Sequence, residues 1–220
     1  MSVFWEHYLT ELRDQVLLMG SLAARNVHMA LRALDERDDQ IAITVEHEDD
    51  QIDQLEIHID ELVITFMSTH APVAKDCRLM LAASKITANL ERIGDSATTI
   101  ARQARILSRW PALAVPRDFP GLRQTVCAQI QEAIDAFLQA NAAKATELIP
   151  KDKTANALFR QVAAELTDWM LDDQEKVVPA MALHAIARTL ERIGDHAVNI
   201  AEEVVFLYRG EDIRHAHAGV

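Results

Sequence analysis

The chain has 220 residues, half of them apolar, and a formal net charge of −12 at pH 7. This apolar content is enough to bury a sizeable core without disulfides, and the acidic balance argues against a nucleic acid duplex or an anionic membrane as a general partner. The two cysteines, Cys77 and Cys127, have neither disulfide nor metal-site spacing, which predicts a reducing compartment. The first ten residues lack a secretory pattern, and no run approaches the roughly 18 apolar residues of a membrane span. We therefore expect a cytoplasmic protein that reaches a membrane only through partners.

Apolar residues recur every three or four positions along the first half of the chain, which predicts three long helices. These helices cover about 3–34, 40–69 and 73–108. A charged cluster at 35–39 forms the first turn, and Pro72 ends the second helix because the residue before a proline disfavours helix. The segment 110–121 holds three prolines and a glycine, so it predicts a non-helical linker.

The second half repeats this arrangement, with predicted helices at about 122–140, 142–171 and 179–208. Pro150 predicts a kink or a broken first turn in the middle helix, and Gly210 stops the last helix. No stretch alternates with the period of a strand over more than a few residues. The predicted fold class is all-α, with two similar three-helix bundles formed by six long helices in a tandem repeat. The expected parts are 1–110 (first bundle), 111–121 (linker), 122–210 (second bundle) and 211–220 (C-terminal tail).

The hexapeptide Leu-Glu-Arg-Ile-Gly-Asp occurs at 90–95 and again, unchanged, at 190–195. The apolar residues around each copy predict that both lie inside amphipathic helices. Within each copy the glutamate and the aspartate are one turn apart on one face. Like charges at this spacing repel by about 0.2 to 0.5 kcal/mol per pair. Each copy therefore needs a compensating partner.

Oxygen-bearing side chains continue beyond the second hexapeptide, because Asn199 and Glu202 fall in the same narrow stripe along about 16 Å of helix. The second predicted helix carries another acidic row, formed by Asp49, Asp53, Glu56 and Asp60. Carboxylate and amide oxygens are hard ligands suited to calcium, magnesium, manganese or iron. The alternative is that both rows are solvated faces partly neutralised by nearby arginines. The spacing alone leaves these two interpretations open.

The first hexapeptide is followed by Thr99 and Arg102 in place of the asparagine and glutamate of the second, and an arginine repels a cation. A site at the first copy therefore depends more on Asp49 and Asp53. The sequence predicts the stronger cation site at the second copy.

The repeat also relates the middle helices of the two halves. It sets Asp152 and Asn156 opposite the aspartates at 49 and 53, while Phe159 stands opposite Glu56. Each middle helix thus keeps one pair of oxygen ligands facing its hexapeptide helix.

Together these motifs resemble the PhoU family, phosphate-transport accessory and signalling proteins of bacteria. The resemblance rests on the two hexapeptides, on Pro-Val-Ala-Lys-Asp-Cys-Arg at 72–78 and on Tyr-Arg-Gly-Glu-Asp-Ile-Arg-His at 208–215, and it covers nearly the whole chain. It implies two three-helix bundles and multinuclear metal clusters, with iron or with zinc, manganese, nickel, magnesium or calcium, held by E/DxxxD pairs. On this chain the implied ligands are Glu91, Asp95, Glu191, Asp195, Asn199, Glu202, Asp49, Asp53, Asp152 and Asn156.

The same resemblance implies a regulatory role. When phosphate is plentiful, such a protein links the phosphate ABC transporter, through its ATPase subunit, to the phosphate-sensing histidine kinase, limits uptake and keeps the starvation genes off. We therefore expect a metal-binding negative regulator that is not an enzyme and binds no nucleic acid; whether it forms a homodimer stays open. The absence of a Glu-x-x-His, phosphate-loop or nucleophile motif agrees with this expectation. Two alternatives are a metal-dependent enzyme acting on phosphorylated compounds and a metal storage protein.

Overall fold

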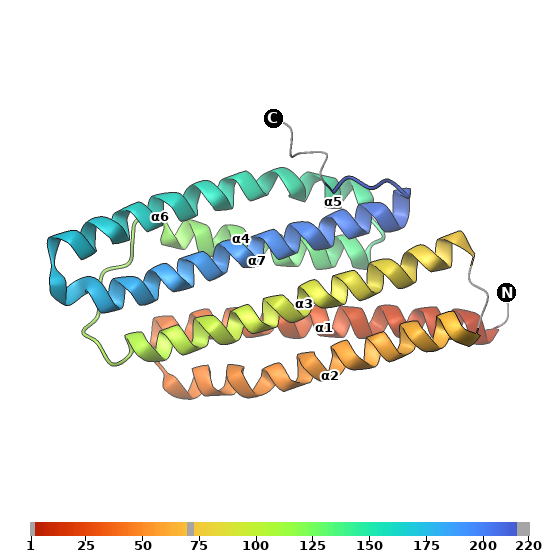
Figure 1. Cartoon of the computed structure of the whole chain (residues 1–220), viewed down its shortest axis with the longest axis horizontal. Helices are drawn as coiled ribbons and strands as arrows, with labels where there is room; N and C mark the ends of the chain where they lie inside the picture. The colour runs from red at the N-terminus through yellow and green to blue at the C-terminus, as the bar shows by residue number, and fades with distance from the viewer. Residues whose placement is uncertain (1–2, 70–72, 215–220) are drawn as a thin grey trace.

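A computed structural model describes residues 3–69 and 73–214 of the protein. Within these ranges the chain forms seven α-helices and two short 3₁₀ helices, without a strand. The long helices run side by side along the long axis of the molecule (Figure 1). The predicted all-α class with a tandem repeat is therefore confirmed. In the same part of the chain, no helix has both the length and the apolar composition that crossing a membrane requires.

The first bundle consists of α1 (Val3–Glu36), α2 (Asp39–Thr69) and α3 (Ala74–Leu107). Their ends agree with the predicted ends to within two residues. The Asp38 carboxylate caps the start of α2. It accepts hydrogen bonds from the backbone N–H groups of Gln40 (2.7 Å) and Ile41 (3.3 Å) in its first turn. Pro72, the predicted stop of the second helix, lies outside the described residues.

The linker between the bundles is non-helical over 108–118 and is held at its start by Arg37. The Arg37 guanidinium donates hydrogen bonds to the backbone carbonyls of Leu107, Ser108 and Trp110. The linker ends earlier than predicted because α4 already begins before Pro120. Proline is tolerated in the first turn of a helix, where its missing N–H would have no helical acceptor.

The second bundle consists of α4 (Phe119–Leu138), α5 (Ala142–Leu148), the 3₁₀ helix η1 (Ile149–Lys151), α6 (Asp152–Asp172), the 3₁₀ helix η2 (Gln174–Lys176) and α7 (Val177–Arg209). The predicted fifth helix is interrupted at Pro150, which lies in η1, so the prediction of a break there is confirmed. Gly210 ends α7 with a left-handed φ of 73°. Its N–H donates to the Phe206 carbonyl at 2.9 Å, which is the helix stop expected of this glycine.

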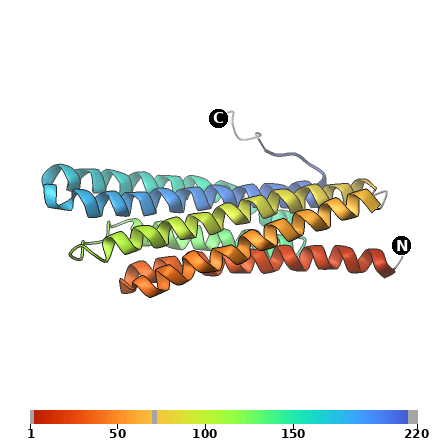
Figure 2. The same ribbon diagram turned by 60° about the horizontal axis from the view of Figure 1, so that its bottom comes forward.

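The two bundles share one apolar core and contact each other mainly through α3 and α7. These helices lie side by side in both views (Figures 1 and 2), and we call their line of contact the seam. The leucine and isoleucine of each hexapeptide point into the core and are at most 1% exposed. Each such side chain contributes about 1.5 to 3 kcal/mol when buried. Burial of these residues fixes the rotation of α3 and α7 and leaves the charged residues of both hexapeptides near the surface.

Candidate metal centres and the seam between the repeats

The first acidic cluster lies between α2 and α3. It consists of five carboxylates, from Asp49, Asp53, Glu56, Glu91 and Asp95. Burial, and then the negative charge of its neighbours in the cluster, raises the pKa of Glu91 to about 7. The same two causes raise the pKa values of Asp53 and Glu56. At neutral pH the cluster therefore holds negative charge at an energetic cost, which a bound cation or a proton would relieve.

Asp49 is the innermost carboxylate of this cluster. Burial raises its pKa to about 6, although the Thr98 hydroxyl, which donates to Oδ2 at 3.1 Å, acts in the opposite direction. Its Oδ1 is buried and receives no hydrogen bond from the described residues. A Cβ at Gly94 would lie 2.7 Å from this oxygen and 2.9 Å from Ile52 Cδ1. The glycine of the first hexapeptide thus makes room for the carboxylate.

The second acidic cluster lies between α6 and α7 and is formed by Asp152, Asn156, Glu191 and Asp195. Burial, followed by the charges of Glu191 and Asp152, raises the pKa of Asp195 to about 7. Asn156 donates from Nδ2 to Asp152 Oδ2 at 2.6 Å. Within 3–69 and 73–214, no group donates a hydrogen bond to the buried Asp152 Oδ1 or Glu191 Oε2. Asp152 Oδ1 is thus the unsatisfied oxygen of the second half that corresponds to Asp49 Oδ1 in the first.

The surroundings of the two clusters differ. Phe159, which replaces Glu56 in the repeat, is buried against the His184 ring (centroids 5.8 Å apart) and beneath the Arg188 guanidinium (5.4 Å). Arg188 Nε also lies 3.7 Å from Glu191 Oε2. The second cluster thus has three carboxylates with Arg188 beside them, whereas the first has five carboxylates with Arg92 and Arg102 at its border. From the number of carboxylates we expect the first cluster to bind a cation more tightly, whereas the sequence pattern predicts the stronger site at the second copy.

Asn199 and Glu202, the predicted extension of the second row, lie at the seam. Asn199 Nδ2 donates to Asn89 Oδ1 of α3 at 3.2 Å, and Glu202 borders a cavity together with Lys85 and Arg92 of α3. For Asn199 the reason is that each step of four residues along α7 overshoots a full helical turn by about 40°. Two such steps carry Asn199 from the α6 side of α7 to the α3 side.

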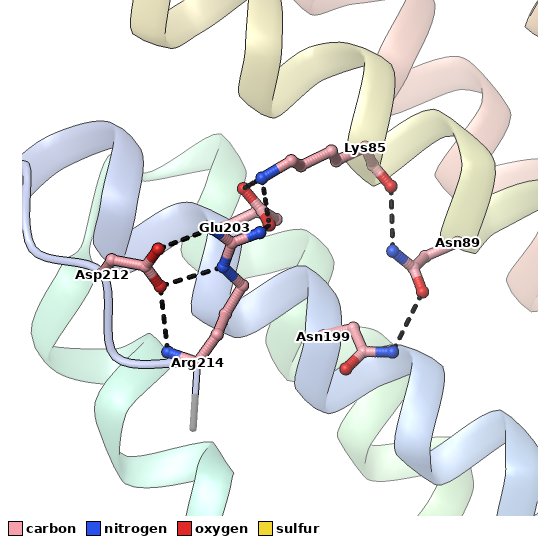
Figure 3. A network of polar contacts seen from close by, with 6 residues as sticks. All are labelled: Lys85, Asn89, Asn199, Glu203, Asp212 and Arg214. Atoms are coloured by element: carbon pink, nitrogen blue, oxygen red, sulfur yellow. Dashed lines mark hydrogen bonds and ion pairs between the residues drawn. The ribbon is translucent and has the colours of Figure 1, made fainter. Parts of the chain in front are cut away.

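An ion-pair network around the buried carboxylate of Glu203 joins the two repeats at the seam, and sequence reasoning missed it. Figure 3 shows the Glu203 carboxylate, which is 4% exposed, accepting hydrogen bonds from Lys85 Nζ of α3 at 3.1 and 3.4 Å. Arg214, beyond the end of α7, lies 3.6 Å from the same carboxylate and pairs with Asp212 through two N–H groups. The available signal was that Glu203 falls on the apolar face of its helix, three residues after Ile200 and four before Leu207.

His196 of α7 lies at the seam, where it contacts Asn89 of α3. Its pKa is lowered to about 4, mainly by burial and further by the positive charges of Arg92 and Arg192. The ring is therefore neutral at pH 7. Its Nδ1 lies 3.1 Å from Asn89 Oδ1. His184 packs against the Phe159 ring, and neither histidine belongs to the ligand set of the acidic clusters named above; His215 and His217 fall outside the described residues.

The donor set of both clusters suits a hard cation. Each contains carboxylate oxygens that are buried without a hydrogen-bond donor among the described residues, and such oxygens are costly unless a cation or proton compensates them. As the side chains lie, however, no three or more His, Cys, Asp or Glu residues in the described part form a group able to hold a metal ion. Binding would therefore require the carboxylates to turn toward the cation.

Comparison with known proteins identifies relatives along nearly the whole chain. The model of the PhoU domain matches residues 16–104 and 120–204, one match per repeat. A protein of Pseudomonas aeruginosa named phosphate-specific transport system accessory protein PhoU homolog is 38% identical over 210 residues, which cover 94% of this chain and 86% of the relative.

Two crystal structures share the fold. PhoU from Pseudomonas aeruginosa superposes with a TM-score of 0.89 at 36% identity, covering 94% of this chain and all of that one. The phosphate transport system regulatory protein PhoU from Streptococcus pneumoniae gives a TM-score of 0.87 at 25% identity, over 94% and 98% of the two chains. These names describe accessory and regulatory proteins, not enzymes, so the metal-dependent enzyme considered above is not supported. With a domain match in each repeat and a relative 38% identical along its length, the chain belongs to the PhoU family.

Proposed function

We propose that this protein is a cytoplasmic negative regulator of phosphate uptake and of the phosphate-starvation response. It acts as an adaptor between the ATPase subunit of a phosphate ABC transporter and the phosphate-sensing histidine kinase. The observation that carries the proposal is the match, over 94% of the chain, to a protein named as an accessory of phosphate-specific transport. The strongly acidic, helical surface supports it, because complementary charge guides docking to basic partner surfaces.

We further propose that the two acidic clusters bind metal ions, with iron first among the candidates and with the E/DxxxD carboxylates as ligands. Glu91, Asp95 and Asp49 would hold the cation in the first repeat, and Glu191, Asp195 and Asp152 in the second. A bound cation supplies positive charge that offsets carboxylate repulsion and satisfies the buried oxygens.

The adaptor role is tested by deleting the gene and by capture experiments with the purified protein. Deletion should derepress alkaline phosphatase in phosphate-rich medium, and the full chain should capture the transporter ATPase and the kinase. Unchanged phosphatase levels together with no capture of either partner would contradict the proposal.

Metal binding is tested by elemental analysis of protein purified without chelator. The variant Glu91→Gln/Asp95→Asn/Glu191→Gln/Asp195→Asn should retain little metal, because all four substitutions keep side-chain size while removing charge. The exposed pair Glu61→Gln/Asp168→Asn serves as control and should retain the wild-type content. Wild-type protein without metal above background would refute the metal sites and leave the adaptor role standing.

A further inference from the structure

Three arginines surround one polar cavity at the seam. The cavity has a volume of about 270 Å³, and its walls include Arg92 and Arg102 of α3 and Arg192 of α7. Arg92 and Arg192 occupy the same position in the two hexapeptide copies, and they meet because α3 packs along α7. Guanidinium groups that share a cavity repel one another. Their convergence calls for an anion that offsets this repulsion.

The chain itself supplies little of that compensation. The guanidinium groups of Arg92 and Arg192 form no hydrogen bond and no ion pair with the described residues, although the protein has 34 acidic side chains. Arg102 pairs with Glu46 at 3.3 Å, yet 63% of its side chain remains exposed. Asp49 and Asp95 also border the cavity. Its walls therefore carry three positive and two negative groups, and two guanidinium groups keep all their donors available.

Positive groups continue along the seam. A second cavity, of about 250 Å³, shares Arg92 and is bordered by Lys85, Arg214 and Asn199. Lys85 and Arg214 are already held by the buried carboxylate of Glu203 (Figure 3). Arg92 thus borders both cavities, and its guanidinium group takes no part in the ion-pair network around Glu203.

We propose that the arginine-lined cavity binds a small tetrahedral oxyanion, for which inorganic phosphate is the ion to test. A guanidinium group presents parallel N–H donors that match two oxygens of such an anion. Arg92 and Arg192 are the primary donors, one from each repeat, and Arg102 with the Thr99 hydroxyl borders the same space. The inference goes beyond the adaptor and metal proposals, because it assigns a ligand to residues that are not cation ligands. It also gives a role to Thr99 and Arg102, which interrupt the acidic row of the first repeat.

The experiment titrates inorganic phosphate into the full-length protein, stripped of metal with EDTA, by calorimetry at constant ionic strength. Removing metal ensures that phosphate cannot bind through a cation, so the outcome is independent of the metal proposal. Wild type should bind one phosphate per chain saturably. Arg92→Gln/Arg192→Gln should weaken binding by about tenfold or more, because each guanidinium supplies charge-assisted hydrogen bonds.

A charge-matched control separates a site from general electrostatic attraction. Arg109 and Arg160 are exposed and border neither cavity, so Arg109→Gln/Arg160→Gln should keep the affinity within about twofold, as expected for screened distant charges. Asp95→Asn should tighten binding by about twofold or more, because it removes a carboxylate from the cavity wall. The proposal is overturned if wild type shows no saturable phosphate binding, if both arginine pairs weaken binding equally, or if Asp95→Asn leaves the affinity unchanged. Circular dichroism and melting temperatures confirm that each variant is folded.

Discussion

The two acidic clusters start from the same hexapeptide and end in different environments. In the first repeat, α2 faces the hexapeptide and contributes three carboxylates to the cluster, and one of them, Asp49, lies against Gly94. In the second repeat α6 contributes only Asp152 and Asn156. Gly194 lies against the carboxamide of Gln129, which comes from α4. A repeated motif therefore specifies the ligands on one helix only. The facing helix decides how much negative charge the site concentrates.

The largest contrast should appear in the stability gained from metal. A cation at a concentration one hundred times its dissociation constant stabilises the folded protein by about 2.7 kcal/mol. Because the first cluster has more carboxylates, Glu91→Gln/Asp95→Asn should remove more of this gain than Glu191→Gln/Asp195→Asn. Melting temperatures measured with and without added metal test the ranking. A greater loss in the second pair would restore the order predicted from the sequence.

Substituting alanine for the glycine of each hexapeptide should change the free energy of unfolding by different amounts. In Gly94→Ala the new Cβ meets Asp49 Oδ1 and the fully buried Ile52, and such overpacking should cost a net of about 1 to 2 kcal/mol. In Gly194→Ala the nearest atom, at 3.0 Å, is the terminal Oε1 of Gln129, and the next, Val126 Cγ2, is at an ordinary contact distance of 3.7 Å. The better helix propensity of alanine offsets that contact, so the net change should stay within about 0.5 kcal/mol. Urea unfolding of both variants measures the difference, and equal losses would show that the glycines have one common role.

The pH dependence is where the clusters should behave alike. The pKa values of Glu91 and Asp195 are raised from 4.5 and 3.8 to about 7 in the folded protein. Between these limits the folded state binds more protons than the unfolded state, so the stability of metal-free protein falls as pH rises toward 7. Below the lower values both states are protonated and the effect disappears. Chemical denaturation at a series of pH values with EDTA checks the sign.

Single variants divide this pH effect between the clusters. Glu91→Gln and Asp195→Asn should each flatten the profile by a similar amount, because each removes one carboxyl whose pKa is raised. A profile that rises toward pH 7 in metal-free wild type would contradict the raised pKa values of these two carboxyls.

The smallest effect should come from Glu56, the carboxylate that Phe159 replaces in the second repeat. Its negative charge contributes to the raised pKa of Glu91. Glu56→Gln should therefore lower the pKa of Glu91 and stabilise the metal-free protein by a few tenths of a kcal/mol, about the size of one like-charge pair on a helix. Titration of the Glu91 carboxyl by NMR measures the shift, and the exposed Glu61→Gln gives the baseline.

Much of the fold follows from local sequence signals. Apolar periodicity placed the long helices because a helix with one apolar stripe must bury it, and Pro150 and Gly210 marked a break and an end for backbone reasons that hold in any context. The hexapeptide glutamates and aspartates were also identifiable, since residues four apart share a helix face wherever the helix lies.

Only the tertiary structure determines which residues of other helices pack against those faces. The row through Asn199 and Glu202 continues in sequence, yet the packing of α7 against α3 carries these residues to the seam. Arg92 and Arg192 are a hundred positions apart, and only the docking of the two bundles brings them to one cavity. The physical reason is that a helical pattern fixes directions about one axis. Charge concentration, desolvation and ion pairing depend on which helices lie alongside, and those contacts are set by the burial of the whole apolar core.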